Sequence, residues 1–388
     1  MKANKLFIFL YLFPVFFINL NFGNDPEIGV PTHILCYTLL IFFGFIIRPN
    51  FFIENSKAII ITILVVIGHS LYYIYAFSEY IFNYMYVVVQ FYFVFFSVCI
   101  VNNSLKHRED IDFFFYIFEF LSKISIVFII LSVIVYKSTG LYFLADSGYG
   151  GFRPHAFFSE PSATSFVLSY FTMVNVIRKN FLWVLLSFIS LFCVSSLIGI
   201  LVFIITLFLW VVLKLNPFKR LLIIFSILFF FFLMLNFFMS LDPDSFGTIS
   251  SDIKRLQHGI EAIITFNQSG YNPRMQTLVE IYEYLERLNG LFLGFGVFSD
   301  TFLPFSQIAA SASNLPAQIY FNFGLVGLIL IYGFMAYVFI FLTGRNRQSL
   351  MFISLLATTS SNSAQGFIIY SVLFVMALIL VKGRYEDF

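Results

Sequence analysis

Three ionisable side chains that could bind an anion or move a proton lie close together in the run GFRPHAFFSEPS, from Gly151 to Ser162. They are Arg153, His155 and Glu160. The planar fork of donors on arginine suits phosphate oxygens, while histidine and glutamate commonly act as general bases. Long apolar segments flank the run on both sides. Because ionisable groups are costly at membrane depth, such a cluster at the end of a span is a candidate functional site.

The composition places the chain among membrane proteins. Of its 388 residues, 60% are hydrophobic and 11% are charged, and the mean hydropathy is +0.93. These values are typical of a chain built from many membrane-spanning helices. The net charge of +2 gives no indication of nucleic-acid binding, so the positions of the charges carry more information than their sum.

The residue pattern gives no support for a metal site or a cofactor. The cysteines fall inside apolar segments, which is typical of small buried hydrophobic residues. The histidines show neither an HxxxH nor an HExxH spacing. We therefore expect no metal ion and no cofactor. The residues concerned are Cys36, Cys99, Cys193, His33, His69, His107, His155 and His258.

Apolar runs predict about twelve transmembrane helices, since one span needs roughly 20 mostly apolar residues. Two long runs are divided, one at the polar and glycine-containing segment 195–199 and the other at the polar stretch 358–366. The predicted fold class is an all-α polytopic integral membrane protein, with 1–388 forming a single membrane domain. The predicted spans are 6–22, 30–47, 58–77, 80–101, 113–136, 157–177, 181–194, 197–214, 221–239, 317–341 and the two halves of 349–381.

The basic residues orient these predicted helices. With a cytoplasmic N-terminus, 15 of the 22 lysines and arginines fall in inner loops or at the ends of the chain, as the positive-inside rule requires. The outer loop 23–29 carries Asp25 and Glu27 and no basic residue. Both termini are then cytoplasmic, and the run from Arg153 to Ser162 lies on the outer face. The inner basic residues are Lys2, Lys5, Arg48, Lys57, Lys106, Arg108, Arg178, Lys179, Lys214, Lys219, Arg220, Arg345, Arg347, Lys382 and Arg384.

Two outer loops, 137–157 and 240–316, are expected to form the face that carries the site. Pro161 suits the first turn of the helix that follows the first loop, where its missing N–H is no loss, and Ser159 suits the N-cap. Glu160 then lies at the outer mouth of that span. A carboxylate there can also serve only to complement the helix dipole, so both interpretations stand at this stage.

The second outer loop contains two predicted amphipathic helices, 252–266 and 275–288, each with its apolar residues on one face. The later helix has an Asn-Pro start signal at 272–273 and a stop signal at Gly290. Arg274 then lies in the first helical turn, where free backbone N–H groups already favour an anion. A solvated surface arginine is the alternative interpretation.

Taken together, these features resemble the Wzy-type O-antigen and capsular polysaccharide polymerases, which are related to the O-antigen ligases. The resemblance rests on an Arg-x-x-x-x-Phe-x-Glu-Pro-Ser pattern from Arg153 to Ser162, at the outer end of a middle span. It covers about 150–335, and the topology extends it to the whole chain. The other matching segments are Ser195-Ser-Leu-Ile-Gly199, Arg274 early in a loop helix, Gly294-Phe-Gly296, and Ser313-Asn314 before Gly324-Leu-Val-Gly327.

The resemblance implies an enzyme that joins undecaprenyl-diphosphate-linked oligosaccharide repeat units at the outer face of the bacterial inner membrane. Arg153 and Arg274 would neutralise the departing diphosphate. Glu160 would act as the general base, with His155 as the alternative base. Further candidates for substrate contact are Arg255, His258, Ser159 and Asn314. The identity of the sugars, the choice between O-antigen and capsule, and binding to a chain-length regulator or a flippase are left open.

Two other functions remain as alternatives. A polysaccharide flippase or other secondary transporter would also have about twelve spans, and Glu119 with Lys123 four residues later is the feature that favours transport. A structural ion pair between these two side chains is the simpler interpretation. An O-antigen ligase would use a different acceptor, but the ligases often have a histidine where this chain has Ser313.

Overall fold

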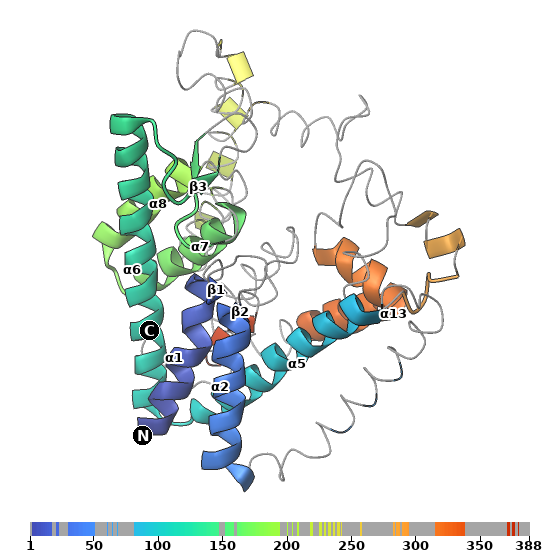
Figure 1. Cartoon of the computed structure of the whole chain (residues 1–388). Helices are drawn as coiled ribbons and strands as arrows, with labels where there is room; N and C mark the ends of the chain where they lie inside the picture. Colours follow the sequence, from blue (N-terminus) through green and yellow to red (C-terminus); the bar gives the residue numbers. More distant parts are fainter. Residues whose placement is uncertain are drawn as a thin grey trace. The chain divides into compact units, whose positions relative to one another are not determined.

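The computed structural model describes residues 2–17, 21–22, 30–50, 81–146, 152–158, 161–194, 289–294 and 315–337, with shorter stretches and single residues elsewhere. Most of the described residues are α-helical, which confirms the helical fold class (Figure 1). The chain divides into two compact units, one made of Met1–Leu121 with Pro273–Asp387 and the other mainly of Ser122–Asn272. Each unit is described separately.

The first unit is built around helices α1 (Lys2–Phe16), α2 (Thr32–Ile47) and α5 (Ile81–Ser104), which contact one another. The short strands β1 (Asn21–Phe22) and β2 (Val30–Pro31) pair antiparallel between α1 and α2. Gly44 lets α2 approach α5, because a Cβ at this position would lie 2.9 Å from Ile100 Cδ1. Small residues at such crossings are a common feature of helix packing in membranes.

Helix α6 (Arg108–Thr139) is the longest described helix and has clear ends. Glu109 and Asp110 lie in its first turn and Lys137 in its last, so the charges complement the helix dipole. It ends at Gly140, which adopts a φ of +74° while its N–H donates to the Tyr136 carbonyl over 2.8 Å. The predicted span 113–136 lies wholly within this helix.

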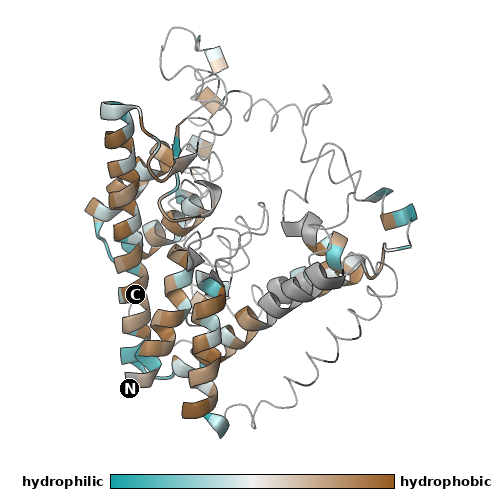
Figure 2. Cartoon of the chain, viewed as in Figure 1, coloured by the Kyte–Doolittle hydropathy of each residue, from teal (hydrophilic) through white to brown (hydrophobic). Residues whose placement is uncertain are grey.

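Within the part of the chain that the structure describes, α6 alone is long and apolar enough to cross a membrane by length and composition. Figure 2 shows its middle turns as predominantly hydrophobic. Large apolar side chains on α6 are exposed at helical spacing rather than covered by protein. They are Tyr116, Phe120, Val127, Leu131 and Ile134. Several shorter apolar helices accompany it, but the predicted number of about twelve spans stays a prediction.

The second unit contains strands β3 (Ala145–Asp146) and β4 (Arg153–Pro154) and helices α7 (Pro161–Ile177) and α8 (Phe181–Val194). Helix α7 begins at Pro161, which confirms the prediction of proline in the first turn. The chain reverses after α7 through Lys179, which has a φ of +58°, and the Asn180 N–H donates to the Asn175 carbonyl over 2.9 Å. This tight turn lets α7 and α8 pack against each other.

Of the remaining predicted spans, the structure describes most of one and only isolated residues of several others. Helix α13 (Leu315–Tyr337) occupies most of the predicted span 317–341, but it is interrupted at Gly324, where φ is +63° and ψ is −162°. The structure therefore has two helical pieces where one continuous span was predicted. The predicted spans 58–77, 197–214, 221–239 and the halves of 349–381 lie outside the described residues, apart from isolated positions.

Candidate functional site

Arg153 and His155 are placed by a small hairpin formed by β3 and β4. Ala145 pairs with Pro154 and Asp146 with Arg153, and the His155 N–H donates to the Leu144 carbonyl over 2.9 Å. Successive side chains on a strand point to opposite faces. Arg153 and His155 are two residues apart, so they share one face of the extended segment while the buried Pro154 lies on the other.

Aromatic contacts pack this hairpin region against α6. The Phe152 and Tyr136 rings are nearly parallel with centroids 4.2 Å apart. After the strand, the Phe157 and Phe128 rings meet edge to face with their centroids 4.7 Å apart. Aromatic pairs of this kind stabilise a structure by about 0.5–1.5 kcal/mol beyond their buried area. Arg153 and His155 thus lie between two anchored aromatic residues.

The turn after His155 is fixed by its own carbonyl oxygen. That oxygen accepts the Phe158 N–H over 3.1 Å and the Thr164 hydroxyl over 2.9 Å. Ala156 is buried and has a φ of +52°, an uncommon conformation for a residue other than glycine. The Thr164 bond joins the turn to the second helical turn of α7, so the segment holding His155 keeps a defined position relative to that helix.

Replacing Thr164 by valine is expected to lower the free energy of unfolding by about 1–3 kcal/mol, because the His155 carbonyl loses a buried donor. Thr172→Val is the matched control: Thr172 is buried in the same helix, but its hydroxyl donates only to the Leu168 carbonyl one turn earlier, over 2.7 Å. Thermal unfolding of the two purified variants compares them. Equal destabilisation would show that the Thr164 bond does not hold the turn.

The structure brings two of the predicted site residues together. Arg153 lies on β4 and His155 directly follows that strand, and both side chains are half-buried. The other predicted site residues lie outside the described residues, so the predicted meeting of Arg153 with Arg274 stays a prediction. Those residues are Glu160, Arg274, Arg255, His258, Ser159 and Asn314.

In the first unit, the end of the predicted loop helix 275–288 is visible. The Asn289 N–H donates to the Glu286 carbonyl over 3.3 Å, and the Gly290 N–H donates to the Leu285 carbonyl over 2.7 Å. These two bonds form a Schellman motif. The predicted stop at this point is confirmed, although the residue with positive φ is Asn289 (+56°) rather than Gly290.

The segment after this helix makes a close backbone contact with α13, which we term the glycine junction and define by Gly294 and Gly324. The Leu325 N–H donates to the Leu291 carbonyl over 2.8 Å, and the Val326 N–H donates to the Phe292 carbonyl over 3.1 Å. In a continuous helix these two N–H groups would donate to carbonyls four residues earlier. The loop segment therefore takes up backbone donors that the interruption of α13 releases.

Both residues of the glycine junction must lack a side chain. A Cβ on Gly294 would lie 2.4 Å from the Asn322 carbonyl carbon, and a Cβ on Gly324 would lie 2.3 Å from the Phe292 carbonyl carbon. Both glycines also have positive φ, +66° and +63°. Both glycines belong to segments on which the resemblance rests, but only the fold shows that each packs against the backbone just before the other.

Arg287, near the end of the predicted loop helix 275–288, forms an exposed ion pair that is expected to contribute little to stability. Its Nη2 lies 3.4 Å from Glu283 Oε2, and the two side chains are 75% and 54% exposed. Exposed pairs of this kind contribute about 0.3–0.5 kcal/mol at most. We expect Arg287→Ala to change the melting temperature by roughly 1 °C or less. A larger loss would show that Arg287 contacts more than Glu283.

The comparisons with known proteins leave the family of this chain open: no protein-family model matches it, and no curated protein matches it. Within the described residues, no group of three or more His, Cys, Asp or Glu side chains is placed to hold a metal ion. The geometry of the described residues and the resemblance of the sequence motifs are therefore the two indications of function.

Proposed function

We propose that the chain is a multi-pass protein of the bacterial inner membrane, with about twelve spans and both termini in the cytoplasm. The distribution of apolar surface supports this. Helices α2 and α8, like α6, expose large apolar side chains along one side. On α2 these are Leu35, Leu39, Phe42 and Ile46, with Phe45 and Ile47 also exposed in its last turn, and on α8 they are Phe181, Leu182, Leu185, Ile189 and Phe192. Soluble proteins rarely expose continuous apolar surfaces of this kind, whereas lipid covers them.

The polar side chains show the complementary distribution. Helix α7 is buried on all sides from 163 to 176, yet it carries several hydroxyl and amide groups there. Ser169, Thr172 and Asn175 each donate to the backbone carbonyl four residues earlier, so each of these side chains has a donor bond that needs no water. Small and hydroxyl-bearing residues inside with apolar bulk outside are typical of helices packed in a bilayer.

Within this setting we propose that the chain polymerises undecaprenyl-diphosphate-linked oligosaccharide repeat units at the outer face of the membrane, to make O-antigen or capsular polysaccharide. The observation that carries the proposal is the extended segment 153–155, which holds Arg153 and His155 half-buried on one face just before α7. The Glu-Pro-Ser part of the resemblance follows directly, so Glu160 is close along the chain.

The proposed reaction is a displacement at the anomeric carbon of the lipid-linked donor. A sugar hydroxyl of the acceptor unit forms the new C–O bond, and the bond from the anomeric carbon to the diphosphate oxygen breaks. Glu160 accepts the hydroxyl proton, or His155 does so in its place. Arg153 and Arg274 stabilise the charge that develops on the diphosphate, which leaves as undecaprenyl diphosphate. Secondary contacts to the substrates are assigned to Arg255, His258, Ser159 and Asn314.

The glycine junction supports a role for the second outer loop in this reaction. It ties the segment that follows the predicted loop helix 275–288 to α13 through backbone hydrogen bonds. Non-helical backbone at membrane depth is tolerated where protein buries it or where it lines a cavity. The interruption of α13 beside the segment 291–294 is therefore consistent with a binding site for a lipid-linked substrate at this position.

The interruption of α13 also favours a second candidate, a polysaccharide transporter, because broken helices frequently form transport sites. One experiment separates the two. The purified protein is supplied with lipid-diphosphate repeat units in detergent, where no membrane separates two compartments. Polymerisation predicts longer lipid-linked chains and released undecaprenyl diphosphate, whereas a transporter leaves the units unchanged. An acceptor made of lipid A core, tested in parallel, identifies the ligase alternative.

A further inference from the structure

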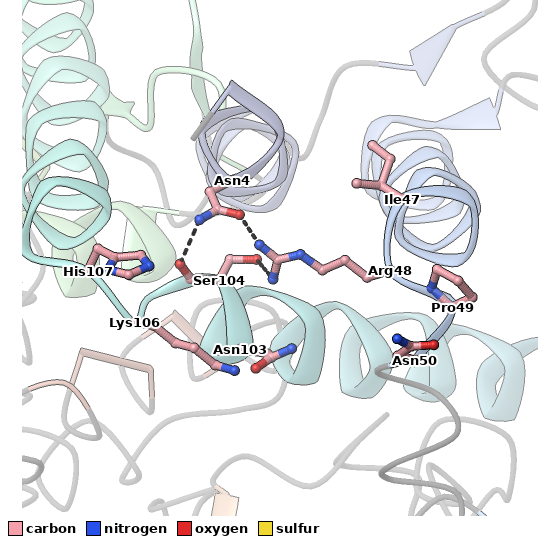
Figure 3. A pocket seen from close by; sticks show the side chains of 9 residues that line it. All are labelled: Asn4, Ile47, Arg48, Pro49, Asn50, Asn103, Ser104, Lys106 and His107. Atoms are coloured by element: carbon pink, nitrogen blue, oxygen red, sulfur yellow. Dashed lines mark hydrogen bonds between the residues drawn. The ribbon is translucent and has the colours of Figure 1, made fainter.

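A pocket of about 300 Å³ lies in the first unit, where the start of α1, the ends of α2 and α5, and the start of α6 meet (Figure 3). Its volume is at the lower end of the range for small-molecule sites. None of its lining residues belongs to β4 or to the glycine junction. Its polar lining includes Asn4, Arg48, Asn103, Ser104, Lys106 and His107.

Neutral groups hold Arg48 in this pocket. Its Nη1 donates to Ser104 Oγ over 3.2 Å, and its Nη2 donates to Asn4 Oδ1. The guanidinium carbon also lies 5.8 Å from the centroid of the Phe7 ring. The hydrogen-bond acceptors named here carry no charge, so they orient the guanidinium without neutralising it.

Asn4 separates Arg48 from a buried carboxylate. Its Nδ2 donates to Asp110 Oδ2 over 2.7 Å and to the Ser104 carbonyl over 3.3 Å. Asp110 is only 1% exposed and does not line the pocket. The chain of contacts from Arg48 through Asn4 to Asp110 fixes the relative positions of α1, α2 and α6, and it leaves the positive end facing the pocket.

The rest of the lining adds donors and a second full positive charge. Lys106 and His107 are exposed in the turn between α5 and α6, and Asn103 lies in the last turn of α5. The lining contains no carboxylate. Guanidinium, ammonium and amide N–H groups together are the donors that phosphate oxygens bind best, and charge-assisted bonds of this kind are roughly twice as strong as neutral ones.

We propose that this pocket binds a phosphate group, which an anionic phospholipid headgroup or free phosphate can supply. An apolar surface beside the pocket favours the lipid: Ile47 lines the pocket and is exposed, and the exposed Phe42 and Ile46 continue along α2. Basic pockets between helices on the cytoplasmic side of a membrane bind anionic headgroups in this manner. The inference rests on the proposed membrane location and is independent of the proposed polymerase chemistry.

Thermal unfolding of the full-length protein in detergent tests the proposal. The melting temperature is measured during titration with phosphatidylglycerol, with phosphatidylcholine of the same acyl chains, and with inorganic phosphate. A ligand that binds only the folded state raises the melting temperature as its concentration exceeds its dissociation constant. We expect a larger rise with phosphatidylglycerol than with phosphatidylcholine. An equally large rise with inorganic phosphate would identify free phosphate as the source.

Two variants test whether the ligand binds in this pocket. Lys106→Gln removes an exposed charge and leaves the hydrogen bonds of Asn4 in place. Arg48→Lys keeps a positive charge but lacks the planar, bidentate donor geometry of the guanidinium. Each is expected to weaken binding by about tenfold. Arg178→Gln is the matched control, since Arg178 is an exposed arginine of the predicted inner face outside the pocket, and it should bind as the wild type does.

Two results would overturn the proposal. One is an equal response to the two lipids together with no response to phosphate. The other is wild-type binding by both Lys106→Gln and Arg48→Lys. Loss of chain lengthening does not affect this test, because binding is measured without repeat units. A protein that binds the anionic ligand but never lengthens chains would reject the proposed function and leave this inference intact.

Discussion

Replacing Gly324 by alanine is expected to abolish chain lengthening and to lower the free energy of unfolding by about 3 kcal/mol or more. Two effects combine at this position. An alanine at a φ of +63° carries the strain of a left-handed backbone, and its Cβ would lie 2.3 Å from both the carbonyl carbon and the carbonyl oxygen of Phe292. The backbone atoms cannot move away unless the bonds to Leu325 and Val326 are lost.

Backbone strain and a clash of the new Cβ with backbone atoms are also expected at Gly294, the other residue of the glycine junction. Gly294→Ala places its Cβ 2.5 Å from the Asn322 carbonyl oxygen, so it should cause a loss similar to that of Gly324→Ala. The double variant should add little to either single change, because each one already separates the two segments. Thermal unfolding and the length distribution of the product measure both effects.

Gly333→Ala is the matched control for these substitutions. It lies in the same helix, and a Cβ there meets nothing within 4 Å. The change to a better helix former should be neutral or slightly stabilising. If Gly324→Ala retains wild-type stability and product length, the glycine junction is not required, and the proposed anchoring of the second outer loop is wrong.

Replacing Arg153 by alanine is expected to reduce the rate of chain lengthening by about a hundredfold or more, because the departing diphosphate loses a charged donor. Arg153→Lys retains the charge but not the bidentate geometry, so we expect an intermediate loss of about tenfold. Initial rates with purified lipid-diphosphate repeat units give both values. The melting temperature, measured in parallel, separates a loss of chemistry from a loss of folded protein.

Arg178→Ala controls for the removal of a positive charge from the second unit. Arg178 is exposed in the turn between α7 and α8, and its replacement should change the rate by about twofold at most. The proposed diphosphate site further predicts comparable losses for Arg274→Ala and Glu160→Gln. Full product length in Arg153→Ala, Arg274→Ala and Glu160→Gln together would reject the assignment of these residues.

Local features of the fold were predictable from the sequence. The bounds of α8 agree with the predicted span 181–194, and α7 begins at the predicted Pro161. The stop near Gly290 is present as well. Each of these features depends on residues within a turn or two of one another. Hydropathy, proline geometry and capping act at this range, so the sequence alone carries the information.

The candidate site was only partly predictable. The sequence indicated that Arg153 and His155 lie together before a helix, and it gave the chemistry of their side chains. It did not indicate that Arg153 lies on a strand, because the pairing of β4 with β3 depends on contacts between segments apart in the chain. It also gave no sign that Thr164 bonds to the His155 carbonyl, since a threonine in a helix is as often bonded within that helix.

For the described part of the chain, the sequence by itself determined that most segments are helical, where α7 and α8 begin, and which residues could carry chemistry. The tertiary structure alone decided that the backbone at Gly294 packs against residues 322–323 and the backbone at Gly324 against residues 292–293, and that Asn4 joins Arg48 to Asp110. The physical reason is the range of the forces involved. Helix formation and hydropathy depend on near neighbours, whereas backbone contacts and polar networks depend on the packing of segments far apart in the chain.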